Sequence, residues 1–147
     1  MRSPLSEFIT KLRVNKTLHG RSVYRKKDVP GHNVFQGYNS FDGDAVDLFA
    51  LAGTPVIAME SGRVTECVDE GPKSRLKVVG EYSIMYAHIN VKDIIHVGSE
   101  ITEGQVIGYI GKEIKDPHLH LELRKNGVSI SASTAKGLVK KISSLCN

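Results

Sequence analysis

The stretch His118-Leu119-His120-Leu121-Glu122-Leu123 alternates polar and apolar side chains at every position. Successive side chains of a β-strand point to opposite faces, so this period of two predicts a strand with leucines on one face and imidazoles on the other. His118 and His120 would then lie roughly 6–7 Å apart at Cα on the same face. Two histidines in this arrangement suit a metal-centred site, because imidazole is the commonest metal ligand, but they also suit a merely polar sheet face.

The centre of the chain has the texture of a β domain. From Gly31 onward, short runs rich in Val, Ile and Tyr are interrupted by Gly, Asn, Asp and Pro. This pattern is typical of an all-β, mostly antiparallel sheet or sandwich. We expect strands at 45–48, 55–58, 62–68, 76–79, 82–88, 105–110 and 118–124. Gly98 and Gly104 fall between expected strands, where a sharp turn favours glycine.

The two ends of the chain differ from this centre. Apolar residues Leu5, Phe8, Ile9 and Leu12 recur at helical spacing and predict a short helix within residues 5–18. Residues 131–145 mix Ala, Lys, Leu, Val and Ile and predict a closing helix. We therefore expect an N-terminal arm over residues 1–30, possessing some helix, a β domain over 31–130 and a C-terminal segment over 131–147.

Size and composition fit one globular domain. The chain has 147 residues, of which 40% are hydrophobic and 24% charged. Its formal charge of +4 favours an anionic partner. Basic residues gather within residues 11–27, but they lack aromatic interleaving and a recognition-helix pattern, so a nucleic-acid partner is not expected. Cys67 and Cys146 lie far apart and lack the CxxC spacing of a structural zinc site.

Four short segments occur in an informative order. They are Ala45-Val46-Asp47-Leu48, Gly53-Thr54-Pro55-Val56-Ile57-Ala58, Tyr86-Ala87-His88-Ile89 and Pro117-His118-Leu119-His120-Leu121-Glu122. Together they resemble the β-sheet core domain of the M23 metallopeptidases, the LytM or lysostaphin-type peptidoglycan endopeptidases. The resemblance extends from about Asn39 to Asn126, within the expected domain of residues 31–130.

The resemblance implies a zinc-dependent hydrolase that cuts peptide bonds of bacterial peptidoglycan. By this resemblance Asp47 and His120 are zinc ligands, and His88 and His118 flank the metal-bound water. Zinc with three protein ligands keeps a fourth position for water and lowers the pKa of that water towards about 7. Glu122 shares the expected face of His120, where it could orient this ligand or form a salt bridge with Arg124 or Lys125.

One expected ligand is missing. The family places a further zinc-binding histidine four residues before the aspartate, and Gly43 stands at that position here. Candidate substitutes are Asp42, Asp44, Asn39 and His32. Alternatively, the site binds metal weakly through two ligands, or the domain has lost catalysis and binds cell-wall material or a protein partner. This inactive module is the alternative to an active endopeptidase.

Features that the sequence lacks bear on one other functional class and on the expected location of the protein. The Gly53–Gly62 region also resembles biotinyl or lipoyl carriers, but Glu60 follows Ala58-Met59 where a carrier needs an acylated lysine. No signal peptide and no apolar run long enough to span a bilayer are visible. We therefore expect action at the bacterial cell wall if the chain is exported or phage-delivered, and a cytoplasmic location otherwise.

Overall fold

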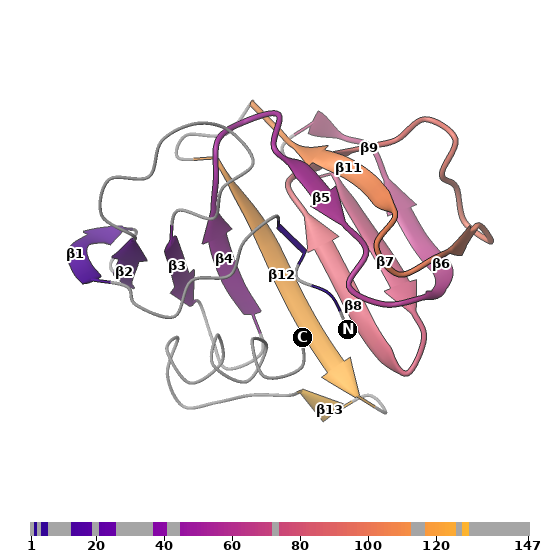
Figure 1. Cartoon of the computed structure of the whole chain (residues 1–147), viewed down its shortest axis with the longest axis horizontal. Coiled ribbons are helices and arrows are strands. Elements are labelled where there is room, and N and C mark those ends of the chain that lie inside the picture. Colours follow the sequence, from indigo (N-terminus) through magenta and orange to yellow (C-terminus); the bar gives the residue numbers. More distant parts are fainter. Residues whose placement is uncertain are drawn as a thin grey trace.

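The described part of the structure, a computed structural model, is built from β-strands in two antiparallel sheets (Figure 1). It comprises residues 2, 4–5, 13–18, 21–25, 37–40, 45–71, 74–112, 117–125 and 128–129. No α-helix forms within these residues, and none of them belongs to a helix that could cross a bilayer. The expected all-β, antiparallel fold class is thereby confirmed.

The larger sheet has ten strands. Nine follow the order β1 (Arg13–Leu18), β2 (Arg21–Arg25), β3 (Gly37–Ser40), β4 (Ala45–Phe49), β12 (His118–Lys125), β8 (Tyr82–Ala87), β7 (Arg75–Val79), β6 (Gly62–Val68) and β10 (Glu100–Ile101), and β13 (Val128–Ser129) pairs with β12. The smaller sheet has the order β5 (Pro55–Ile57), β11 (Val106–Ile110) and β9 (Ile89–Val91). β12 therefore lies in the middle of the larger sheet, between β4 and β8.

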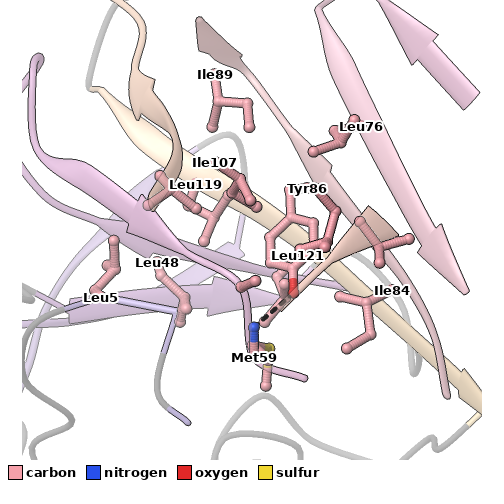
Figure 2. Packing of buried hydrophobic residues seen from close by; sticks show 14 of the residues in the cluster. Leu5, Leu48, Met59, Leu76, Ile84, Tyr86, Ile89, Ile107, Leu119 and Leu121 are labelled. Atoms are coloured by element: carbon pink, nitrogen blue, oxygen red, sulfur yellow. Dashed lines mark hydrogen bonds between the residues drawn. The ribbon is translucent and has the colours of Figure 1, made fainter. Parts of the chain in front are cut away.

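The hydrophobic core lies between the two sheets. Figure 2 shows Leu119 of β12 beside Ile107 of the smaller sheet, and Leu121 belongs to the same core cluster. Leu119, Leu121 and Leu123 are at most 1% exposed, and each such buried side chain stabilises the fold by about 1.5–3 kcal/mol. Because side chains alternate along a strand, the residues between these leucines face away from the smaller sheet. His118, His120 and Glu122 occupy that outer face.

A buried tyrosine ties β8 to the segment after β5. Tyr86 is fully buried, and its hydroxyl accepts a 2.9 Å hydrogen bond from the Met59 backbone N–H (Figure 2). Burying a polar group without a partner is costly, so this bond satisfies a donor that the core would otherwise isolate. The bond positions β8, which ends immediately before His88.

The two expected glycine turns are confirmed. Gly98 and Gly104 have φ of +93° and +86°, in the left-handed region where other residues are strained. Both residues bring their turns back onto the sheets: the Gly98 N–H donates to the Val64 carbonyl, and the Gly104 N–H donates to the Ala58 carbonyl. The turns lead into β10 and β11, respectively.

The sequence prediction was wrong for the end of the N-terminal helix. Residues 13–18 form β1, which pairs with β2 from Arg13 opposite Arg25 to Leu18 opposite Arg21. The backbone hydrogen bonds of a helix form within the helix, whereas β1 pairs with β2, which in turn pairs with β3. This pairing between strands overrides the weak local preference for helix. Residues 6–12 of that expected helix and the expected C-terminal helix lie outside the described residues.

A short N-terminal segment contributes to the core from far away in sequence. The Arg2 N–H donates to the Met59 carbonyl, and the Pro4 carbonyl accepts from the Ile57 N–H, at 2.7 and 2.8 Å. These bonds continue the pairing of the smaller sheet along β5. Leu5 is 1% exposed within the main core cluster. Residues outside the family-like region thus help to build its core.

Candidate active site

One row of residues crosses the larger sheet beside the histidines. His120 of β12 has Asp47 of β4 as its Cα partner on one side and Ala87 of β8 on the other. Asp47 in turn lies opposite Asn39 of β3. Residues directly opposite in an antiparallel ladder share a face and have Cβ atoms about 4.5–5.5 Å apart. The pairing of β4 with β12 therefore brings together the two residues expected to bind zinc, although they are far apart in sequence.

His88 joins this group through an unusual backbone conformation. It lies between the end of β8 and the start of β9, where the chain passes from the larger sheet to the smaller one. Its φ of 61° is left-handed, which is uncommon for a residue with a side chain. Its N–H donates to the Ser74 carbonyl and its carbonyl accepts from the Gly111 N–H, at 2.8 and 3.0 Å. Two hydrogen bonds thus hold a strained residue in place, as is common at functional sites.

Three imidazole rings are gathered by this arrangement. The His88 ring centroid lies 4.9 Å from that of His118 and 5.8 Å from that of His120, with nearly perpendicular planes in both pairs. His118 and His120 are half-buried, and Nε2 of His118 is shielded from solvent. Rings this close can act on one bound molecule, since hydrogen-bond reach is about 2.6–3.2 Å from each nitrogen.

Glu122 completes the cluster by contacting His120. Its Oε1 lies 3.0 Å from Nε2 of His120, and the two side chains are 29% and 19% exposed. A carboxylate accepts hydrogen bonds, so this contact favours the neutral imidazole tautomer with its proton on Nε2, in which Nδ1 has the lone pair that could bind a metal. The sequence left open a salt bridge from Glu122 to Lys125, but Lys125 pairs with Glu81 at 3.3 Å.

The donor types suit zinc, but the described residues do not supply a complete set of ligands. Aspartate oxygen and histidine nitrogen are usual zinc ligands, and the register brings Asp47 and His120 together. Within the described ranges no group of three or more His, Cys, Asp and Glu side chains could hold a metal. Of the candidate substitutes, Asn39 lies in the row described above. Asp42, Asp44 and His32 lie outside the described residues, as does Gly43.

Of the remaining histidines, the described residues include His96, which lies outside this group. His96 is exposed, and its Nδ1 lies 3.0 Å from the Val97 carbonyl oxygen. His19 lies outside the described residues. The histidine cluster therefore consists of His88, His118 and His120 among the histidines that the structure places.

A comparison with known protein families matches the part of the chain that carries this cluster. The family model "Peptidase family M23" matches residues 42–132, which include all four residues of the expected site. The chain belongs to peptidase family M23. Within this M23 domain the match covers β4 through β12, so it includes the strands that carry the histidine cluster and the smaller sheet that covers the core.

Two curated staphylococcal relatives share this M23 region. The glycyl-glycine endopeptidase ALE-1 of Staphylococcus capitis is 32% identical over 107 residues, which cover 68% of the chain and 29% of that relative. Lysostaphin of Staphylococcus simulans is 34% identical over 98 residues, covering 62% of the chain and 19% of that relative. The chain therefore spans less than a third of the length of either curated relative.

A solved structure matches the fold. The catalytic domain of lysostaphin from Staphylococcus simulans superimposes with a TM-score of 0.53 at 27% identity, covering 68% of this chain and 79% of that one. The match covers 79% of that catalytic domain but 19% of the curated lysostaphin sequence, so the likeness to lysostaphin lies in its catalytic domain. This likeness supports the M23 fold of the chain.

Proposed function

We propose that this M23 domain is a zinc-dependent endopeptidase that hydrolyses peptide bonds of bacterial peptidoglycan, with Asp47 and His120 as metal ligands and His88 and His118 as catalytic residues. The observation that carries the proposal is the cluster of His88, His118 and His120, with Asp47 opposite His120 in the sheet. Family membership and the glycyl-glycine endopeptidase and lysostaphin relatives support the substrate class. Such a substrate places the site of action at the cell wall.

When bound, zinc would supply a Lewis acid that lowers the pKa of water to about 7 and polarises the amide carbonyl. The chain's own residues do the remaining work. Hydrolysis joins the water oxygen to the carbonyl carbon, breaks the C–N bond and delivers a proton to the departing nitrogen. In this proposal His88 and His118 orient the water, carry its proton and donate a hydrogen bond to the developing oxyanion.

His118 and His88 have different structural support for this work. His118 belongs to the central strand β12, whose leucines hold it against the core. His88 is held by its two backbone hydrogen bonds at the passage between sheets. Groups fixed before substrate arrives lose little freedom on reaction, which is the basis of catalysis by preorganisation.

The test combines metal content with hydrolysis. Zinc is measured by mass spectrometry after zinc loading and dialysis, and cleavage is followed on purified peptidoglycan and on oligoglycine peptides. We expect about one zinc per chain in the unmodified protein. His120→Ala should lose both zinc and hydrolysis, whereas His118→Ala should retain most of the zinc and lose turnover. Equal zinc in the unmodified protein and His120→Ala would contradict the ligand assignment.

The alternative function has its own outcome in the same experiment. A non-catalytic module that binds cell-wall material would retain no zinc and cleave neither substrate. Such a module would still sediment with insoluble peptidoglycan. That combination of results would replace the endopeptidase proposal.

A further inference from the structure

A pocket of about 200 Å³ opens on the outer face of the larger sheet beside the histidine cluster. It is lined by Lys77 of β7, Ser83 and Met85 of β8, and Glu122 and Arg124 of β12. The register explains this grouping, because Glu122 lies opposite Met85 and Met85 lies opposite Lys77, while Arg124 lies opposite Ser83. The pocket thus crosses three adjacent strands.

Glu122 connects this pocket to the proposed catalytic centre. The same carboxylate that lines the pocket lies 3.0 Å from Nε2 of His120. Residues two and four positions along β12 from His120 are roughly 7 and 13 Å away at Cα. A peptide extended along the sheet face would therefore reach the pocket about two to four residues from the bond that is cleaved.

The charges of the lining define what the pocket can bind. Lys77 and Arg124 are cationic, Ser83 adds a hydroxyl donor, and Met85 adds an apolar surface. The five lining residues carry two positive charges and one negative charge, that of Glu122, whose carboxylate also contacts His120. Arg and Lys recognise carboxylates through charge-assisted hydrogen bonds, which are about twice as strong as neutral ones. The lining suits a small anion attached to a short aliphatic chain.

We infer that this pocket is a substrate subsite that binds a carboxylate group of the peptide, about two to four residues from the cleaved bond. This inference rests on the proposed endopeptidase function and deepens it. An interior glycyl-glycine segment has no charged group, so the pocket would favour a peptide bearing either a C-terminal or a side-chain carboxylate close to the cleaved bond. The common chemistry is the carboxylate itself.

The test measures peptide binding separately from hydrolysis. Binding is titrated by NMR on the full chain carrying His118→Ala, so that the peptides persist. The probes are acetyl-tetraglycine with a free carboxylate, its C-terminal amide, and acetyl-Gly-Gly-Glu-Gly amide, which carries its carboxylate on a side chain. We expect at least one acidic peptide to bind about threefold or more tighter than the neutral amide, an effect within the range of one exposed ion pair. The acidic peptide that binds tighter identifies the source of the carboxylate.

Charge-neutralising variants localise the effect. In the same background Lys77→Gln should abolish the preference for the acidic peptide. The control Lys92→Gln removes an identical charge at the end of the smaller sheet, outside the pocket lining, and should preserve that preference. Equal binding of all three peptides, no binding of any of them, or equal losses in Lys77→Gln and Lys92→Gln would overturn the inference.

The results separate this inference from the proposed function. Hydrolysis by the unmodified protein is followed on the same peptides and on peptidoglycan. A preference for carboxylate that depends on Lys77 without any hydrolysis would retain the subsite and remove the endopeptidase proposal. Hydrolysis without that preference would retain the endopeptidase proposal and remove the subsite.

Discussion

Oε1 of Glu122 lies 3.0 Å from Nε2 of His120, so the carboxylate and the imidazole are within hydrogen-bond distance of each other. This contact favours the tautomer of His120 with the proton on Nε2, which in the proposed zinc site would leave Nδ1 to bind the metal. The relationship also links the histidine cluster to the neighbouring pocket, which Glu122 lines. Glu122 is therefore proposed as a positioning residue that acts through His120.

Loss of this carboxylate should weaken zinc binding. We expect Glu122→Ala to reduce zinc affinity about 10–100-fold, as is typical when a partner of a metal ligand is removed. Affinity is measured by competition with a chromogenic chelator, independently of turnover. Glu122→Gln should lose less, because its amide oxygen can still accept from Nε2 of His120. If Glu122→Ala binds zinc with the same affinity as the unmodified protein, Glu122 does not position His120 for zinc binding.

The missing third ligand can be located by the same competition assay. Asn39 lies opposite Asp47 in the sheet, whereas Asp44 is a stronger donor type outside the described residues. The variants are Asn39→Ala and Asp44→Asn. Substitution of the residue that completes the site should lower the zinc affinity of the protein ten-fold or more, which is about 1.4 kcal/mol or more. Ser40→Ala, the next residue of β3, serves as the control. If neither variant differs from that control, both candidates are excluded.

The left-handed backbone of His88 allows the effects of substitution on stability and on activity to be separated. Asparagine tolerates a positive φ, so His88→Asn should change the free energy of unfolding by less than about 1 kcal/mol while hydrolysis is lost. A β-branched residue is strained in this conformation, so His88→Val should destabilise by a further ~1–2 kcal/mol. Urea unfolding measures both variants. Equal stability of the two would show that the backbone at this position relaxes.

Removal of the Tyr86 hydroxyl should destabilise the fold without altering the site chemistry. Tyr86→Phe leaves the Met59 N–H without its acceptor in the core, which costs about 1–3 kcal/mol. Thermal or urea unfolding checks the value, and zinc content should remain unchanged. Tyr109→Phe removes an identical hydroxyl from a side chain that is 40% exposed and should cost much less. Equal costs would contradict the role of the buried bond.

Glu60 predicts a pH dependence of stability. Burial raises the pKa of Glu60 above its usual 4.5, and Glu81 adds to this effect, while the hydrogen bond from the Tyr82 N–H opposes it. A carboxyl group with a raised pKa binds its proton more readily in the folded state than in the unfolded state. The contribution of Glu60 to stability is therefore fully present below pH 4.5 and is lost as the pH rises through the pKa of the folded state.

The matching variant is Glu60→Gln, which retains an oxygen to accept from the Tyr82 N–H. Its stability relative to the unmodified chain should increase as pH rises from about 4 to about 7. Urea unfolding across that range, on chelator-treated protein, measures the difference. Parallel stability curves for the two proteins would refute the prediction.

Local pattern predicted the central elements well. The alternation from His118 to Leu123 predicted β12 and its buried leucines, since the two faces of a strand are encoded at a period of two. Gly98 and Gly104 marked their turns because few other residues accept a positive φ. The short strands β9, β10 and β13 were not predicted, because two or three residues carry too little pattern.

The same reasoning failed where partners decide the structure. Residues 13–18 have a weak local preference, and their pairing with β2 makes them a strand. Leu5 is buried because the segment around Pro4 pairs with β5, which no local pattern indicates. Long-range pairing depends on the surroundings of a segment more than on its own propensity.

For the site, local alternation was enough to predict that His118 and His120 share a face. Strand pairing and packing, which that alternation does not encode, bring Asp47 opposite His120, hold His88 in a left-handed conformation beside both rings and bring Glu122 into contact with His120. These are contacts between strands or choices of side-chain rotamer. Their energies depend on neighbours that the linear order of residues does not specify.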